Sequence, residues 1–209
     1  LPPNTQTNSV PHQAESKPQL SSGQSTVPSS RTSISLPANS PVVVPTNSQI
    51  VTQFIHNTLQ AGKHGIAIVW SVGGQSHQGV DVDLYVRPPN ESVELSFRNK
   101  ESAFGQHLRD IVDAGGDSIY SQDPTVAFEY VELDPSVSLR DTSVWLDLFR
   151  NDSNQAVQGL VMVVTKGGIL QDAFRFPPAL CGDRGSQATH RDENPNWVRV
   201  DLNALLSRK

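Results

Sequence analysis

Cysteine is almost absent from this sequence of 209 residues, since Cys181 is the only one. No disulfide can form within the chain, so its stability must come from a packed core. The sequence also lacks any apolar run of about 18 residues, which argues against a membrane-spanning helix. Its net charge of −5 argues against nucleic acid as a partner. We therefore expect a chain of one or two domains with no membrane span and no nucleic-acid ligand.

Motifs that carry catalysis are missing as well. The sequence has no His-Glu-x-x-His motif and no cysteine pair, so a zinc site would have to come from scattered residues. His77 and His107 are near the most acidic strand, and we interpret them as exposed histidines or as histidines satisfied within the core. The segment Gly-Gln-Ser-His at 74–77 is similar to the start of a nucleophile elbow, but Gln78 stands where that motif requires Gly. The sequence therefore indicates no catalytic residue.

The N-terminal part differs in composition from the rest of the chain. Residues 1–45 are mostly Ser, Thr, Pro, Asn and Gln, with few large apolar side chains. Such a segment cannot bury enough apolar surface to offset the entropy that is lost on ordering. We expect residues 1–45 to be a disordered linker or tail and residues 46–209 to form a single domain. Apolar residues at helical spacing in 47–61 predict one short helix at the start of this domain, with an extended strand as the alternative.

One stretch organises the rest of the domain. In residues 80–86, Val-Asp-Val-Asp-Leu-Tyr-Val, apolar and polar side chains alternate without a break. A period of two is typical of a β-strand with one face on a core. We expect the three valines and Leu84 to enter the core, and Asp81, Asp83 and Tyr85 to face the opposite way.

Turn signals separate several further apolar segments, and no long helical stretches lie between them. This arrangement favours an all-β fold, an antiparallel β-sandwich of jelly-roll or immunoglobulin-like type with about eight to ten strands. The segment 160–165 is so apolar that we expect a central strand buried on both faces. One helical turn is expected at 203–209, and strands are expected at 66–72, 80–86, 93–97, 108–112, 127–133, 144–149, 160–165, 169–176 and 197–202.

Two carboxylates one strand repeat apart, Asp81 and Asp83, point to a metal site with calcium (Ca2+) as the expected ion. Alternate residues of a strand share one face, about 7 Å apart, so these carboxylates can converge on one cation. Calcium takes about 6 to 8 oxygen ligands, so further residues are needed. The alternative is a solvated acidic strand without an ion, balanced by basic residues such as Arg87. The candidates for the additional ligands are Asp110, Asp113, Glu129 and Asn99.

The run Asp-Val-Asp-Leu-Tyr-Val at 81–86, followed by two prolines, resembles a strand of certain bacterial β-sandwich modules. One group is the pre-peptidase C-terminal domain of secreted bacterial proteases, which shares only this strand. The other is the YfaP-like domain of unknown function, whose Pro-Glu-Asn element is missing here before Glu129. The resemblance covers residues 66–133 and implies a non-catalytic, metal-binding β-sandwich in a secreted or envelope protein. The YfaP-like pattern continues through Asn99, Gly105, Asp110, Asp113, Gly115 and Glu129.

Together these features lead us to expect a non-catalytic ligand-binding or adhesion module of a secreted, periplasmic or cell-envelope protein. Its ligand is expected to be a carbohydrate or a protein. Two alternatives stay open: a metal-dependent hydrolase that uses the acidic cluster, and a purely structural domain whose acidic face is only solvated. Clustered histidines would favour the hydrolase, and only His77 and His107 are near, so the module is preferred.

Overall fold

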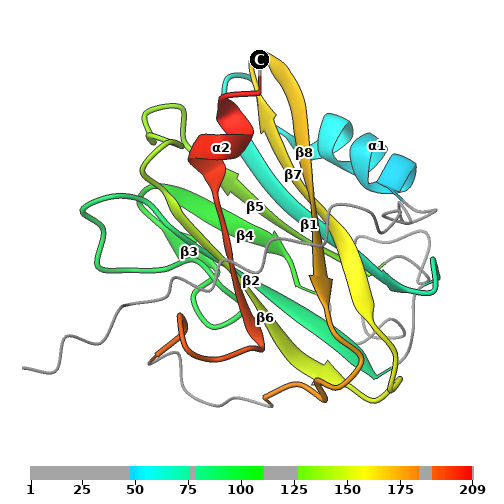
Figure 1. Cartoon of the computed structure of the whole chain (residues 1–209). Helices are drawn as coiled ribbons and strands as arrows, with labels where there is room; N and C mark the ends of the chain where they lie inside the picture. The colour runs from blue at the N-terminus through cyan, green and yellow to red at the C-terminus, as the bar shows by residue number, and fades with distance from the viewer. Residues whose placement is uncertain (1–47, 76–78, 111–126, 184–189, 209) are drawn as a thin grey trace, which may run out of the picture. The chain divides into compact units, whose positions relative to one another are not determined.

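Figure 1 shows the computed structural model of the chain, in which the described residues are 48–75, 79–110, 127–183 and 190–208. All of them belong to one compact unit that spans residues 36–209. The linker or tail expected at residues 1–45 lies outside the described residues and stays a prediction. Within the described part, no helix is long and apolar enough to cross a membrane.

The described strands form two antiparallel sheets, which confirms the predicted all-β sandwich. The larger sheet has six strands in the order β3-β4-β5-β1-β7-β8, and the smaller has three in the order β2-β6-β9. Strands of the larger sheet are β1 (His64–Val72), β3 (Glu101–Ser102), β4 (Gly105–Arg109), β5 (Phe128–Leu133), β7 (Val157–Thr165) and β8 (Gly168–Phe176). Strands of the smaller sheet are β2 (Val80–Arg87), β6 (Ser143–Asn151) and β9 (Trp197–Val200).

The main core lies between the two sheets. Ile66 and Ile68 of β1 and Leu84 of β2 are fully buried in one cluster of apolar side chains. The valines of β2 belong to the same cluster, so the alternation in 80–86 places its apolar residues as predicted. Full burial of one Leu or Ile side chain contributes about 1.5–3 kcal/mol. This periodicity therefore fixes which face of β2 packs against the larger sheet.

A second core lies on the other face of the larger sheet, under the helix α1 (Ser48–Thr58) (Figure 1). Val51 and Ile55 of this helix are fully buried with Tyr130 and Met162. Strands β1 and β7 are thus covered on both faces, which explains their continuous apolar sequences and confirms the central strand predicted at 160–165. The helix predicted within 47–61 is confirmed, although it ends at Thr58, and the extended alternative is wrong.

The strand predicted at 93–97 is wrong. Leu95 makes only one isolated bridge, to Val86, because the chain turns back at residues 96–99. Leu95 is fully buried in the main core, whereas Val93 is 41% exposed, so the two side chains do not share a face.

Other boundaries differ by a few residues. The strand predicted at 108–112 is β4, which already starts at Gly105. A Cβ atom at Gly105 would lie 2.3 Å from the carbonyl oxygen of Glu132, so the close approach of β5 requires glycine there. The predicted helical turn is α2 (Leu202–Leu206), and Asp201 caps it by accepting a hydrogen bond from the Ala204 backbone N–H at 2.9 Å.

The outer face of the smaller sheet is covered, not solvated. Tyr85, Trp145 and Trp197 pack together there and are 9%, 8% and 6% exposed. The guanidinium of Arg191 lies over Tyr85 and Trp197, 4.8 and 4.2 Å from their ring centres, and donates two hydrogen bonds of 2.7 Å to Glu94. Tyr85 therefore faces away from the main core as predicted, but it is buried in a separate aromatic cluster.

Candidate metal centre

Strand β2 is an edge of the smaller sheet, and groups from other elements bond to its outer side. The indole N–H of Trp70 donates to the Val80 carbonyl at 3.3 Å, and Leu95 exchanges two backbone hydrogen bonds with Val86. Between these contacts, the backbone N–H of Leu84 donates to a side chain, Oε2 of Glu129, at 2.6 Å. A carboxylate from the larger sheet therefore takes the place of a neighbouring strand.

Glu129 reaches β2 because of its position on β5. It pairs in register with Ile68 of β1, so both side chains point into the main core. Glu129 is 0% exposed, and Nε2 of His107 lies 3.2 Å from the same oxygen that accepts from Leu84. The other oxygen, Oε1, is buried and has no hydrogen-bond partner among the described residues.

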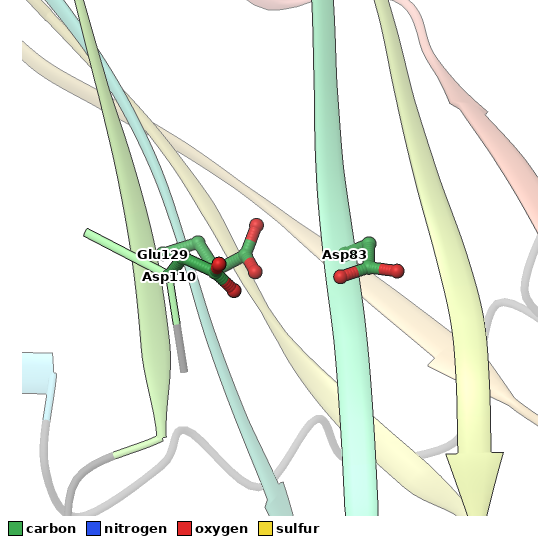
Figure 2. A group of neighbouring side chains, drawn as sticks. All are labelled: Asp83, Asp110 and Glu129. Carbon is green, nitrogen blue, oxygen red and sulfur yellow. The ribbon is translucent and has the colours of Figure 1, made fainter. Parts of the chain in front are cut away.

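Two further carboxylates approach Glu129, and they come from different elements (Figure 2). Asp83 lies in the middle of β2, and Asp110 directly follows β4. One carboxylate oxygen of each residue lies within 4.8 Å of those of the other two. Oxygen atoms on opposite sides of a calcium ion are about 5 Å apart, because each lies about 2.3–2.6 Å from the ion. The group is therefore compact enough to hold one metal ion.

Burial makes the charged forms of Asp83 and Glu129 unfavourable. It raises the pKa of Asp83 to about 7, an effect that the charges of Asp110 and Asp183 increase and that of Arg98 opposes. Burial also raises the pKa of Glu129 well above its ordinary value, and neighbouring aspartates, Asp83 first, raise it further. Protons therefore compete with a metal ion for this group, and a divalent cation would displace them.

His107 positions Glu129. Its side chain on β4 is fully buried, and burial lowers the pKa of the imidazole to about 4, so the ring is neutral at neutral pH. A neutral ring with its proton on Nε2 donates to Oε2 of Glu129, and this contact is then a hydrogen bond, not an ion pair. His107 is thus a core histidine, as one of the two interpretations expects, but only Nε2 is engaged, since Nδ1 is buried without a hydrogen-bond partner among the described residues. His77 lies outside the described residues.

Three of the predicted ligand residues come together, namely Asp83, Asp110 and Glu129. Asp113 lies outside the described residues. Asn99 is exposed in the turn that ends the 93–97 segment, and it is not part of the group.

Asp81 does not join this group. A β-bulge between Asp81 and Val82 shifts the register of β2, and Asp81 lies opposite Arg150 of β6. The alternative of a solvated acidic strand is also wrong, because Asp81 and Asp83 are only 3% and 4% exposed. Residues on the outer face of the smaller sheet are covered by later segments of the chain, which strand periodicity does not reveal.

Two carboxylates that we did not single out from the sequence extend the acidic cluster. Asp147 of β6 pairs in register with Asp83 and is 2% exposed. Burial raises the pKa of Asp147 to about 9, and the charges of Asp183 and Asp83 add to the effect. Asp183 accepts a hydrogen bond of 2.9 Å from the indole N–H of Trp197. Alternation in 144–149 places Asp147 on the outer face, but only the strand pairing sets it beside Asp83.

Comparisons with protein-family models, with curated proteins and with solved structures found no match to this chain. The resemblance to the YfaP-like and pre-peptidase C-terminal domains is therefore a hypothesis that rests on residues 66–133 alone.

Proposed function

We propose that this chain is a non-catalytic β-sandwich module that binds one divalent cation, calcium first, at Asp83, Asp110 and Glu129. One observation carries the proposal. Oε1 of Glu129 is buried and has no hydrogen-bond partner among the described residues, and one carboxylate oxygen each of Glu129, Asp83 and Asp110 lie within 4.8 Å of one another. A buried carboxylate without compensation is costly in free energy, and a bound cation offsets that cost.

The chemistry of the group favours calcium. All three side chains offer oxygen. Because Oε2 of Glu129 already accepts from Leu84 and His107, Oε1 and two bidentate aspartates would supply about five of the roughly 6 to 8 ligands that calcium takes. Zinc prefers Cys and His ligands, and among the described residues no Cys or His belongs to the group. Calcium is therefore the first ion to test, with magnesium, manganese and zinc as competitors.

A cation at this position would link the two sheets. Asp83 belongs to the smaller sheet, Glu129 to the larger one, and Asp110 follows strand β4 of the larger sheet. The ion would close the sandwich along the outer side of β2 and stabilise the folded state by mass action. Extracellular calcium-binding modules work at about 10⁻⁴–10⁻³ M, so we expect an affinity in this range for the secreted or envelope location that we propose.

For the module as a whole we propose ligand binding or adhesion, with a carbohydrate or a protein as the ligand. This part rests on the resemblance of residues 81–86 to a strand of bacterial β-sandwich modules. The hydrolase alternative is less well supported, because a metal-activated water needs an open coordination position. Asp83 and Glu129 are only 4% and 0% exposed, which leaves little room for a substrate.

Thermal unfolding in calcium and in chelator tests the proposal. At about 100 times Kd, calcium should stabilise the wild-type chain by about 2.7 kcal/mol and raise its midpoint. Asp83→Asn should abolish this rise. Asp141→Asn is the matched control, because Asp141 is exposed in a turn where its side chain accepts a hydrogen bond from Ser138, so the rise should persist. A wild-type midpoint that does not respond to calcium, magnesium, manganese or zinc would contradict the proposal. It would favour the alternative of a purely structural domain.

A further inference from the structure

Within the described part of the chain, the acidic group is most accessible to solvent at Asp110. Asp83 is 4% exposed and Glu129 is 0% exposed, whereas the side chain of Asp110 is 11% exposed. An ion that arrives from solvent would therefore meet Asp110 before the other two carboxylates.

A lysine already occupies that position. Nζ of Lys100 lies 3.1 Å from Oδ2 of Asp110, and the lysine side chain is 55% exposed. The backbone of Lys100 is held in place, because its carbonyl accepts a hydrogen bond of 2.7 Å from the backbone N–H of His107. Only the flexible four-carbon stem of the lysine would have to move for the ammonium to leave Asp110.

The ammonium of Lys100 and a divalent cation are both positively charged, so they would compete for the carboxylate of Asp110. A calcium ion would lie about 2.3–2.6 Å from an oxygen of Asp110. Nζ of Lys100 lies only 3.1 Å from Oδ2 of the same residue. The two positive charges would therefore lie beside the same carboxylate. Their repulsion opposes joint occupancy, and the half-exposed lysine can exchange its ion pair with Asp110 for contact with solvent.

We propose that Lys100 is a tethered counter-ion that occupies Asp110 while the site is empty and leaves it when a divalent cation binds. This inference rests on the proposed function, because it presupposes a cation site. The buried Oε1 of Glu129, without a hydrogen-bond partner among the described residues, is the separate observation that points to a ligand there. Competition with Lys100 lowers the affinity of the site for the cation. Binding of a cation in turn releases the side chain of Lys100 into solvent.

Calorimetric titration of the full chain with calcium chloride tests the exchange. Lys100→Gln removes the competing charge and keeps a polar stem, and it should bind calcium about 3- to 10-fold more tightly than wild type. Lys166→Gln is the matched control, because Lys166 is exposed in the turn between β7 and β8 and its loss should leave the affinity unchanged. If Lys100→Gln and Lys166→Gln both bind as wild type does, the inference fails and the proposed function stands. If neither wild type nor Lys100→Gln binds any cation, both fail.

Lysine acylation read by mass spectrometry gives a second measurement on the wild-type chain. Saturating calcium should increase the rate at which N-hydroxysuccinimidyl acetate modifies Lys100, since its amino group is released from Asp110. The rate at Lys166 should stay constant. Unchanged reactivity of Lys100 in a sample whose titration shows calcium bound would overturn the exchange.

Discussion

The backbone N–H of Leu84 donates a hydrogen bond of 2.6 Å to the side chain of Glu129, which belongs to the other sheet. An edge strand usually needs a neighbouring strand, a covering loop or solvent for its outer backbone groups. Here a fully buried carboxylate fills part of that role, and two more carboxylates lie within 4.8 Å of it. The closure of the sandwich and the candidate metal centre therefore depend on the same residue.

Substitution of Glu129 separates its two roles. Glu129→Ala should destabilise the chelated protein by about 2–4 kcal/mol, because it leaves buried donors from Leu84 and His107 without an acceptor. Glu129→Gln keeps an amide oxygen for these donors and removes the buried charge, so its cost in chelator should stay below about 1 kcal/mol. Both variants should lose the response to calcium. Urea unfolding with and without calcium measures both effects, and equal costs for Ala and Gln in chelator would contradict the role of the hydrogen bond.

The two faces of β2 should both contribute to stability. Leu84→Ala should cost about 2–5 kcal/mol, because its side chain is fully buried in the main core. From periodicity alone, Tyr85→Ala would be much milder if Tyr85 faced solvent. The structure instead predicts a cost of about 2–4 kcal/mol, because the Tyr85 ring lies 4.8 Å from that of Trp197 and is 9% exposed. Denaturant unfolding of both variants checks this, and a loss of under about 1 kcal/mol for Tyr85→Ala would show that the aromatic cluster is not packed.

The sequence predicts the fold well because the fold depends on local periodicity. Alternation in 80–86 and the apolar run in 160–165 specify which strands have one buried face and which have two. The segment 93–97 alternates in the same way, yet Leu95 alone bridges to β2. Alternation does not indicate whether a partner strand is available. The error in the strand predicted at 93–97 is therefore visible only from the strand pairing of the structure.

The candidate site was predictable only in part. Asp83, Asp110 and Glu129 were named from their residue types and from a resemblance, and the structure brings them together. The register shift beside Asp81 and the register that sets Asp147 beside Asp83 are properties of strand pairing. Distances between residues on different strands follow from that pairing. The pairing cannot be read from the residue types along one strand.

Without calcium, the stability of the fold should decrease as the pH rises. The pKa is raised from 3.8 to about 7 for Asp83 and to about 9 for Asp147, so the folded chain holds protons that the unfolded chain releases. This stabilisation is complete below about pH 4 and is lost as the pH rises through about 7 and then about 9. Urea unfolding in chelator between about pH 5 and 9 measures the slope.

Asp147→Asn separates this effect from general charge repulsion. It should flatten the pH dependence in its upper part, because the amide does not titrate and keeps the uncharged state at all pH values. Asp141→Asn, at an exposed turn, should leave the slope unchanged. Because the pKa of His107 is lowered from 6.5 to about 4, this residue makes stability increase with pH below about 6.5. A chelated wild-type protein whose stability is constant or increases between about pH 7 and 9 would therefore contradict the burial of these carboxyl groups.

Diffraction from crystals grown with calcium tests the central claim most directly. The account predicts one ion about 2.3–2.6 Å from carboxylate oxygens of Asp83, Asp110 and Glu129. It also predicts that Nζ of Lys100 moves away from the position 3.1 Å from Asp110 that it occupies without an ion. Crystals at saturating calcium that show no ion at these three residues, with Lys100 still paired to Asp110, would contradict it.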